Sequence, residues 1–181
     1  MPTLNEEIRG CTGCGLCGAR TQAVPGEGYL PARVLFVGEA PGQEEDLRGL
    51  PFVGKSGQLL RKMIEFLGFE SYFFTNIVKC RPPENRNPTP DEIKACRGFL
   101  DRQLIEIQPK VVVAVGKFAA QTLLEVEIST TALREGVYRL PGASTLVVPV
   151  FHPSYVLRTP SQMGKLLSDL RKARILEEKL K

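Results

Sequence analysis

The chain has 181 residues, of which 43% are hydrophobic and 24% are charged, and its formal net charge is +4. These proportions are typical of one soluble globular domain and exclude a disordered chain or a fibre. No apolar run approaches the ~20 residues that a transmembrane helix needs, and residues 1–10 lack the apolar core of a secretory signal. We therefore expect a cytoplasmic protein of one domain, whose mildly basic charge permits an anionic partner without requiring one.

Four apolar segments of strand length alternate with helical patterns along the chain. The expected strands lie at residues 32–38, 73–78, 111–116 and 146–151. They are rich in Val, Ile or Phe with little polar alternation, which is typical of strands buried on both faces of a parallel sheet. The expected helices lie at residues 56–67, 90–107, 117–124 and 162–180, with Thr89 capping the second. The alternation predicts an α/β fold, a three-layer sandwich with a four-stranded parallel sheet between helices.

Polar residues follow three of the expected strands where each strand ends. Glu39 follows the first strand, Asn76 lies near the end of the second, and His152, the single His of the chain, follows the fourth. In sheets of this class, ligands bind outside the carboxyl ends of the strands. The Pro-rich segment at residues 79–90 also follows the second strand, and loops of that length in a compact domain are usually functional. We therefore expect a binding site at this edge of the sheet.

The five cysteines indicate a metal site. Cys11 and Cys14 form a C-x-x-C pair, Cys17 extends it, and Cys80 and Cys96 lie further along the chain. A C-x-x-C pair lets two thiolates face one metal, which is why zinc and iron–sulfur sites both use it. Ligand identity alone does not separate these two, so both remain open at this point. A ferredoxin is disfavoured because the fourth Cys of the bacterial ferredoxin run is absent.

Residues 49–56, GLPFVGKS, match the phosphate-binding pattern G-x-x-x-x-G-K-[ST]. That loop requires a buried strand directly before it, so that backbone N–H groups cradle phosphate at the start of a helix. Residues 43–48 are polar and acidic instead, and no later apolar strand ends in an Asp that would hold magnesium. We interpret the match as coincidental, which disfavours a nucleotide hydrolase.

Several longer motifs point together to one family. They are CTGC at 11–14, GEAPG at 38–42, EED at 44–46, PFVG at 51–54, TNIVKCRPP at 75–83, NPTP at 87–90 and HPSYVLR at 152–158. With these motifs the chain resembles the family 4 uracil-DNA glycosylases, the iron–sulfur type of the uracil-DNA glycosylase superfamily. The resemblance extends from Cys11 to about Leu170. It implies a monofunctional DNA-repair enzyme that removes uracil from single- or double-stranded DNA and leaves an abasic site.

The resemblance also implies a cofactor and a base-binding site. One [4Fe–4S] cluster is expected on Cys11, Cys14, Cys80 and Cys96, with Cys17 outside the ligand set. Around the flipped uracil, His152 is expected to donate to O2, Asn76 to pair with O4 and N3–H, and Phe52 to stack on the ring. The surrounding turn is expected to supply backbone groups and to hold the attacking water, through Gly38, Ala40, Pro41 and Gly42.

Three possible roles of Glu39 remain open. As a catalytic carboxylate it would position the water, stabilise the positive charge that develops on the sugar, or exclude the methyl group of thymine. Other branches of the superfamily place an Asp or Asn in this motif, where this chain has Ala40 and Gly42. Glu45 and Asp46 are interpreted as groups at the start of a helix or behind the site.

The resemblance assigns a DNA-contacting role to two sets of residues. The first set would enter the DNA where the base has left, combining an apolar wedge with a phosphate contact: Ser154, Tyr155, Val156, Leu157 and Arg158. The second set offers further contacts to the DNA backbone: Lys55, Ser56, Lys79, Arg81 and Arg86.

Uracil-containing DNA is the expected partner, and we expect a monomer. A sliding clamp is a further candidate partner. A related branch that bonds covalently to uracil-DNA carries a His-containing insertion after the second strand, and residues 79–90 contain no His. An alternative from another class stays open, namely an iron–sulfur module that binds nucleic acid or senses redox state without catalysis.

Overall fold

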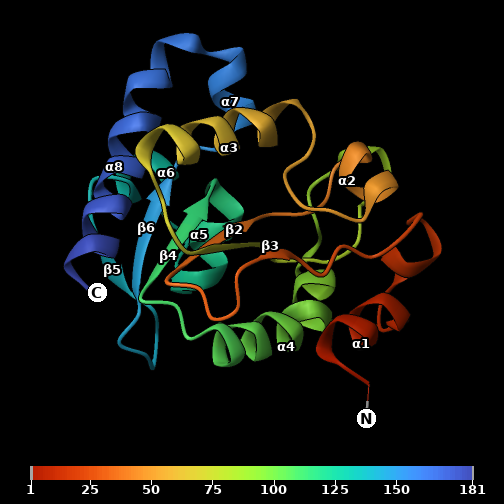
Figure 1. Ribbon diagram of the computed structural model, residues 1–181. Helices are drawn as coiled ribbons and strands as arrows, with labels where there is room; N and C mark the ends of the chain where they lie inside the picture. Colours follow the sequence, from red (N-terminus) through yellow and green to blue (C-terminus); the bar gives the residue numbers. More distant parts are fainter. Residues whose placement is uncertain (1, 181) are drawn as a thin grey trace.

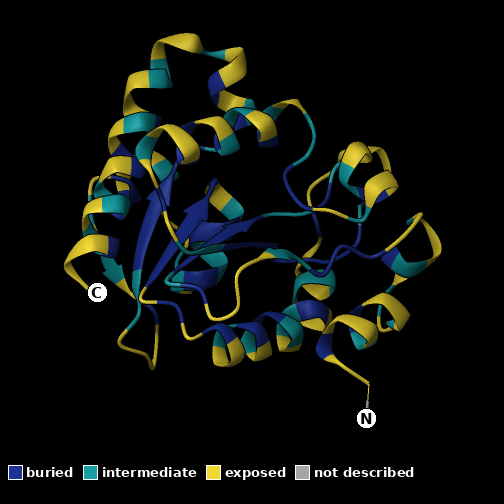
Figure 2. Ribbon diagram, viewed as in Figure 1, coloured by how far each residue is buried: buried dark blue, intermediate teal, exposed yellow. Residues whose placement is uncertain are grey.

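The computed structural model of the chain describes residues 2–180. Four parallel strands form the centre of the sheet in the order β3-β2-β4-β6 (Figure 1). They span Val34–Gly38 (β2), Tyr72–Asn76 (β3), Val111–Val115 (β4) and Leu146–Val150 (β6). All residues of β2 and β4 are buried, as expected for strands covered on both faces (Figure 2). The predicted α/β fold with a central parallel sheet is confirmed.

The sheet is larger than the four strands predicted. β1 (Glu27–Gly28) pairs antiparallel with β3, and β5 (Tyr138–Arg139) pairs antiparallel with β6, so that each closes one edge. Two-residue strands carry no readable alternation, which is why the sequence did not predict them. They also shorten the exposed edges of the sheet, which limits pairing with other chains.

Helices cover both faces of the sheet and complete the three layers. The residues of β2 alternate between two cores: Leu35 and Val37 face one, and Val34 and Phe36 face the other. The first core is closed by α1 (Leu4–Gly10), α4 (Pro90–Ile107), α5 (Lys117–Leu124) and α6 (Thr130–Leu133). The second is closed by α3 (Lys55–Leu67), α7 (Pro153–Arg158) and α8 (Met163–Lys179).

The connecting segments contain short helices that the sequence did not predict. They are η1 (Gly15–Gly18), α2 (Gln43–Arg48), η2 (Pro83–Asn85) and η3 (Pro160–Gln162). The sequence did not predict α1, α6 or α7 either. The predicted cap of α4 is confirmed, since Thr89 Oγ1 accepts from the Glu92 N–H and the Thr89 N–H donates to the Glu92 carboxylate. Because α2 rather than a strand precedes the Gly49–Ser56 segment, that segment lacks the context of a phosphate-binding loop. Within residues 2–180, no helix combines the length and apolarity needed to cross a bilayer.

Candidate active site

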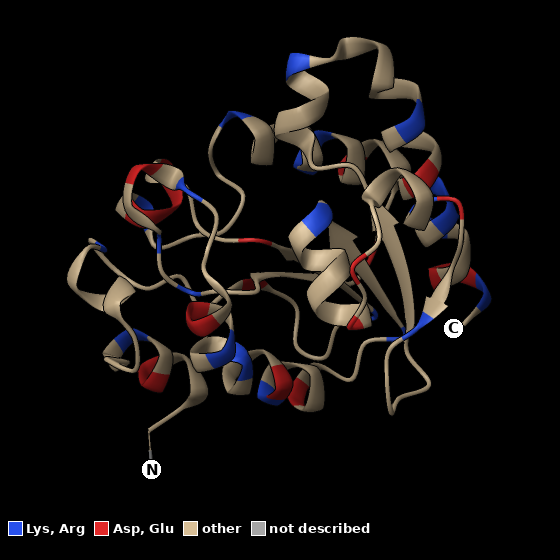
Figure 3. Ribbon diagram, turned by 180° about the vertical axis from the view of Figure 1, so that it is seen from behind, with Lys and Arg blue, Asp and Glu red and all other residues tan. Residues whose placement is uncertain are grey.

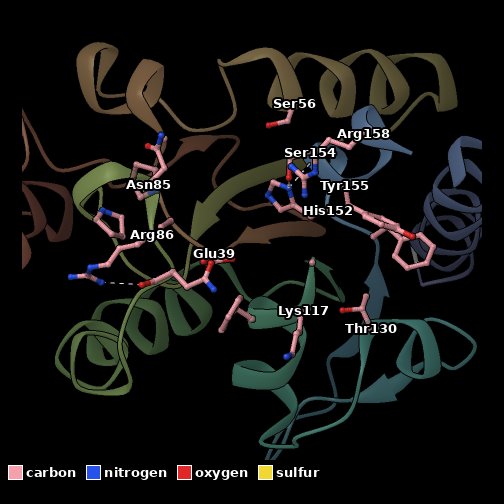
Figure 4. A pocket seen from close by; sticks show the side chains of 18 of the residues that line it. Glu39, Ser56, Asn85, Arg86, Lys117, Thr130, His152, Ser154, Tyr155 and Arg158 are labelled. Atoms are coloured by element: carbon pink, nitrogen blue, oxygen red, sulfur yellow. Dashed lines mark hydrogen bonds between the residues drawn. The ribbon is translucent and has the colours of Figure 1, made fainter. Parts of the chain in front are cut away.

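A cleft of about 840 Å³ opens at the carboxyl ends of the parallel strands (Figure 4). In Figure 4, His152, Ser154 and Arg158 lie on one side of it, and Lys117 and Thr130 lie on the opposite side. Ten residues predicted to form the site line this cleft: Glu39, Ala40, Pro41, Gly42, Ser56, Arg86, His152, Ser154, Tyr155 and Arg158. They come from four separate segments of the chain, which the parallel sheet brings to one edge.

His152 occupies the N-cap position of α7 and presents one ring nitrogen as a donor. Its Nδ1 accepts a hydrogen bond from the Ser154 backbone N–H (3.2 Å) and lies 2.7 Å from Ser154 Oγ. A ring nitrogen that accepts carries no hydrogen, so the proton of the neutral imidazole is assigned to Nε2. Burial lowers the pKa of His152 to about 4, and the charge of Arg158 acts in the same direction. His152 is therefore a neutral donor at physiological pH.

Gly116, at the end of β4, allows His152 to pack against the sheet. Its φ is +94°, and a Cβ added there would lie 3.0 Å from His152 Cβ and 3.2 Å from Cδ2. A side chain at this position would be strained and would press on the imidazole. The close approach of glycine backbone and ring fixes the direction of Nε2.

Gly38, Asn76 and Phe52 form a tight buried cluster next to the cleft. Gly38 and Asn76 are paired across β2 and β3. A Cβ on Gly38 would lie 2.4 Å from Asn76 Oδ1 and 2.8 Å from Phe52 Cζ. These three residues do not line the cleft themselves, but Gly38 joins it through its peptide bond to Glu39.

The side-chain amide of Asn76 is available for recognition. Asn76 is only 3% exposed, and within the described chain its amide makes no hydrogen bond to another residue. Buried amides are normally paired, so an unpaired one beside a cleft is a candidate binding group with one acceptor and two donors.

Phe52 is held in an unusual backbone conformation. Its φ is +55°, a region that side chains other than glycine rarely adopt. Arg61 fixes it from one side, because Nε donates to the Phe52 carbonyl (3.0 Å) and Nη2 to the Pro51 carbonyl (2.8 Å). Gly57 permits the contact from α3, since a Cβ there would lie 2.2 Å from the Phe52 carbonyl carbon. Strain of this kind persists where the surroundings over-determine it, as they do at functional sites.

Glu39 places a carboxyl group in the cleft. Figure 4 shows it between the side that carries Arg86 and the side that carries His152. Its backbone carbonyl accepts from the Val78 N–H (3.1 Å), which fixes the turn after β2. Burial raises the pKa of Glu39 to about 7, so that both protonation states are accessible near neutral pH.

Glu45 ties the two sides of this region together. Its Oε2 accepts from the Gly42 N–H (3.1 Å), and its Oε1 accepts from the N–H groups of Val53 (2.9 Å) and Gly54 (2.8 Å). The adjacent Asp46 is buried, and both its oxygens accept from the Thr21 N–H at 3.0 Å. The structure confirms the interpretation of Glu45 and Asp46 as groups at the start of a helix and behind the site.

The five cysteines line one small space together with Arg20 and Lys79. All five are free thiols. Arg20 Nη1 donates to Cys80 Sγ at 2.9 Å, a contact that favours a thiolate there, although burial raises the pKa of Cys80. In the chain from residue 2 to 180, no group of three or more His, Cys, Asp or Glu side chains is arranged to hold a single metal ion. The soft donor set fits a cluster, in which several irons share the thiolates, better than one zinc ion.

Comparison with known proteins agrees with this geometry. The sequence profile of the uracil DNA glycosylase superfamily matches residues 25–175. The chain belongs to this superfamily. Three relatives, each named "Type-4 uracil-DNA glycosylase", confirm the resemblance. The protein of Archaeoglobus fulgidus is 43% identical over 92% of this chain and 88% of its own length. That of Sulfurisphaera tokodaii is 44% identical over 97% and 84%, and that of Thermotoga maritima 42% identical over 96% and 93%.

Two residues expected to touch DNA are buried in this uracil-DNA glycosylase fold. Lys79 is 1% exposed and Val156 is 0% exposed, so the prediction that they contact DNA directly is wrong. Val156 packs into the core beneath α7, as its helical position requires. Its neighbours Tyr155 and Leu157 remain 38% and 46% exposed and stay available as a wedge.

Arg81 and Arg86, which were expected to contact the DNA backbone, already form hydrogen bonds within the protein. Arg86 lines the cleft but forms two hydrogen bonds with the Glu92 carboxylate, at 2.7 and 2.9 Å. Arg81 lies outside the cleft lining, and its Nε donates to Asn85 Oδ1 (2.8 Å). Lys55 is also outside the lining, whereas Ser56 next to it lies inside.

The sequence did not predict one wall of the cleft. This wall consists of Gly116, Lys117 and Phe118 at the start of α5, with Thr130 and Thr131 of α6. The first three follow the third parallel strand, so the rule applied to the other strand ends would have found them. The two threonines lie on a four-residue helix with no pattern that could have indicated a site. Cys17 likewise lines the cysteine space although it was placed outside the ligand set.

Proposed function

We propose that the protein is a DNA-repair glycosylase that hydrolyses the N-glycosidic bond of uracil in DNA. The observation that carries this proposal is the neutral Nε2–H donor of His152 in a cleft that adjoins the unpaired amide of Asn76. The names of the three relatives support the same activity. Single- and double-stranded DNA both serve as substrate, and the products are free uracil and an abasic site.

Uracil must leave the base stack before it can reach this site. Extruding a nucleotide from a duplex costs a few kcal/mol, which contacts to the flipped base and to the DNA backbone offset. The Asn76 amide donates to uracil O4 and accepts from N3–H, whereas cytosine presents the reversed pattern. Phe52, beside Asn76, stacks on the uracil ring.

Bond cleavage separates charge between sugar and base. As the C1′–N1 bond breaks, its electron pair moves into the uracil ring and negative charge develops on O2. The Nε2–H of His152 donates to that oxygen, and an oriented donor of this kind is worth about 3–4 kcal/mol of barrier. A neutral imidazole suits this role, because the donor hydrogen is present without the cost of burying a cation.

Glu39 acts on the other reactant. Its carboxylate accepts a proton from the attacking water while the water oxygen bonds to C1′. The negative charge of the carboxylate also stabilises the positive charge that develops on the sugar. A carboxyl group whose pKa is raised to about 7 is a better proton acceptor than an exposed one.

We also propose that Cys11, Cys14, Cys80 and Cys96 hold one [4Fe–4S] cluster, and that Cys17 is not a ligand. When bound, the cluster supplies a covalent cross-link between the N-terminal loop and the Cys80–Cys96 segment, without a redox step in the reaction. Iron analysis and visible absorbance test this. Cys17→Ser is expected to keep the iron of the wild type and Cys14→Ser to lose it, and iron retained by Cys14→Ser overturns the ligand assignment.

Contacts to DNA come from the side chains around the cleft. Arg158, Ser154, Tyr155 and Leu157 contact the strand on the α7 side, and Lys117 contacts it on the α5 side. Figure 3 shows acidic positions gathered on α2, whereas a basic position lies at the start of α5. Binding through phosphates is independent of sequence and weakens as salt rises. The enzyme acts as a monomer in the cytoplasm, and a sliding clamp is its candidate partner.

One assay tests the proposal and its alternative. Oligonucleotides that contain uracil or thymine are incubated with the protein, and abasic sites are cleaved with alkali. We expect cleavage at uracil only, lowered by about 100-fold or more in His152→Ala and Asn76→Ala. Lys94→Ala, at an exposed position of α4, serves as the unchanged control. Full activity in both site variants overturns the site assignment, and DNA binding without uracil release favours the non-catalytic module.

A further inference from the structure

Lys79 is a buried polar side chain that the proposed mechanism does not use. It lies three residues beyond β3 and is 1% exposed. Its Nζ is 2.7 Å from Thr75 Oγ1, 2.6 Å from the main-chain carbonyl of Asn76 and 2.7 Å from Gln103 Oε1. The side chain therefore turns back onto the strand that carries the base-recognising Asn76.

The three partners hold the Lys79 amino group in one position. The Asn76 carbonyl and Gln103 Oε1 can only accept hydrogen bonds. The Thr75 hydroxyl also lies within hydrogen-bond distance of the Pro25 carbonyl (3.0 Å) and of Gln103 Oε1 (2.9 Å). This network holds the Lys79 amino group against β3 whether or not the group is charged.

The Lys79 side chain also borders the cysteines. In the described part of the chain no carboxylate pairs with Lys79; burial lowers its pKa to about 7, and the charges of Cys96 and Cys80 act in the opposite direction. Lys79 lines the same small space as the five cysteines. The cysteine space and the strand that carries Asn76 therefore meet at this one side chain.

Gln103 completes a link between the two regions. It lies on α4, the helix that carries Cys96, and its Nε2 donates to the Pro25 carbonyl at 2.8 Å. Lys79 thus touches the cysteine space on one side and the backbone of Asn76 on the other. A change in position at the cysteines can reach the carbonyl of Asn76 through this single side chain.

We propose that Lys79 is a positioning residue that couples the cysteine site to uracil recognition. Its amino group, at the edge of the cysteine space, holds the Asn76 main chain and so aims the Asn76 amide at the base. This inference rests on the proposed function. It assigns the cysteine site a second role beyond cross-linking the chain, because the position of the cysteines also sets the geometry of base recognition.

A double-mutant cycle tests the coupling in the full-length, iron-containing protein. Lys79→Met is compared with Lys94→Met, at an exposed position of α4, and each is combined with Asn76→Ala. Loss of the hydrogen bond to the Asn76 carbonyl predicts that Lys79→Met lowers kcat on uracil DNA by about 10- to 100-fold, with KM unchanged. In the Asn76→Ala background the same change is expected to lower kcat by less than about twofold. If Lys79 has a merely structural role, Lys79→Met lowers kcat by the same factor in both backgrounds. That result overturns the proposal.

A second readout does not depend on activity. The release of iron to a strong chelator is followed by colour, and Lys79→Met is expected to lose iron several-fold faster than Lys94→Met. Equal rates of iron release in the two variants overturn the link between Lys79 and the cysteines. This readout does not depend on uracil release. A wild type that releases no uracil overturns the proposed function instead. If Lys79→Met does not fold, Thr75→Val removes one acceptor and keeps the lysine. We then expect Thr75→Val to lower kcat by a smaller factor, and only when Asn76 is present. An equal fall in kcat in the Asn76→Ala background overturns the proposal.

Discussion

The backbone N–H of Ser154 donates to Nδ1 of His152 over 3.2 Å, which assigns the ring proton to Nε2 on the cleft side. His152 is the single histidine of the chain, so its NMR signals need no assignment. We expect its Hε1 resonance to titrate near pH 4, because burial lowers the pKa from 6.5. A titration of the free protein from neutral to acidic pH checks this. A midpoint near the ordinary value would contradict the neutral donor.

The same lowered pKa predicts a change in stability with pH. Between pH 6.5 and about 4 the unfolded chain binds a proton at His152 and the folded chain does not. This contribution to the free energy of unfolding is present above pH 6.5 and is lost as the pH falls towards 4. Urea unfolding of the wild type and of His152→Gln is expected to show a weaker acid dependence in the variant.

Glu39 is expected to contribute a pH dependence of stability of the opposite sign to that of His152. Burial raises its pKa from 4.5 to about 7, so its stabilising contribution is present below pH 4.5 and is lost as the pH rises through 7. The proposed proton acceptor must be ionised, so kcat on uracil DNA is expected to rise with pH through about 7 and then level off. Glu39→Gln is expected to lower kcat and to remove this rise, with Glu44→Gln, an exposed position, as the control. If kcat of Glu39→Gln still rises with pH through about 7, the rise belongs to the ionisation of another group.

The close approach at Gly38 predicts a specific loss. A Cβ there would lie 2.4 Å from Asn76 Oδ1, so Gly38→Ala must displace the recognition amide or Phe52. We expect kcat on uracil DNA to fall by about 10- to 100-fold, and stability to fall by about 1–3 kcal/mol. Gly98→Ala is the matched control, because a Cβ there meets open space and alanine favours a helix. Unchanged kcat in Gly38→Ala would show that the cluster is not the base-binding site.

The elements that the sequence predicted correctly carry long, regular patterns. Four apolar strands and four longer helices were readable because their periodicity extends over five or more residues. The positions of Asn76 and His152 followed from the rule that parallel strands present their carboxyl ends at one edge. The resemblance to the family supplied Phe52, whose role nothing in the local pattern indicates.

What the sequence could not show depends on contacts distant in the chain. Lys79 looks like a surface residue in the polar stretch KCRPPENR, yet Gln103 of α4 provides an acceptor that allows its burial. Val156 lies in a segment that reads as an exposed loop, and only the helical geometry of α7 turns it inward. The strained φ of Phe52 depends on Arg61 and Gly57, which no local pattern connects to it.

Glu45 offers a test of how the site is assembled. Its carboxylate accepts three backbone N–H groups, from Gly42, Val53 and Gly54, and thereby joins the turn after β2 to the segment that carries Phe52. Glu45→Ala leaves these donors without a partner and is expected to lower the free energy of unfolding by about 2–4 kcal/mol. Because Phe52 is then less well placed, kcat on uracil DNA is expected to fall as well.

Glu44 is the matched control for Glu45 on the same helix. It forms only an exposed ion pair with Arg48 at 3.1 Å, so Glu44→Ala is expected to change stability by less than about 0.5 kcal/mol and to keep kcat. Urea unfolding and the uracil-release assay are run on both variants at neutral pH. If Glu45→Ala loses stability but keeps full kcat, the tie between the two segments serves the fold alone, and Phe52 is positioned by Arg61 and Gly57 without it.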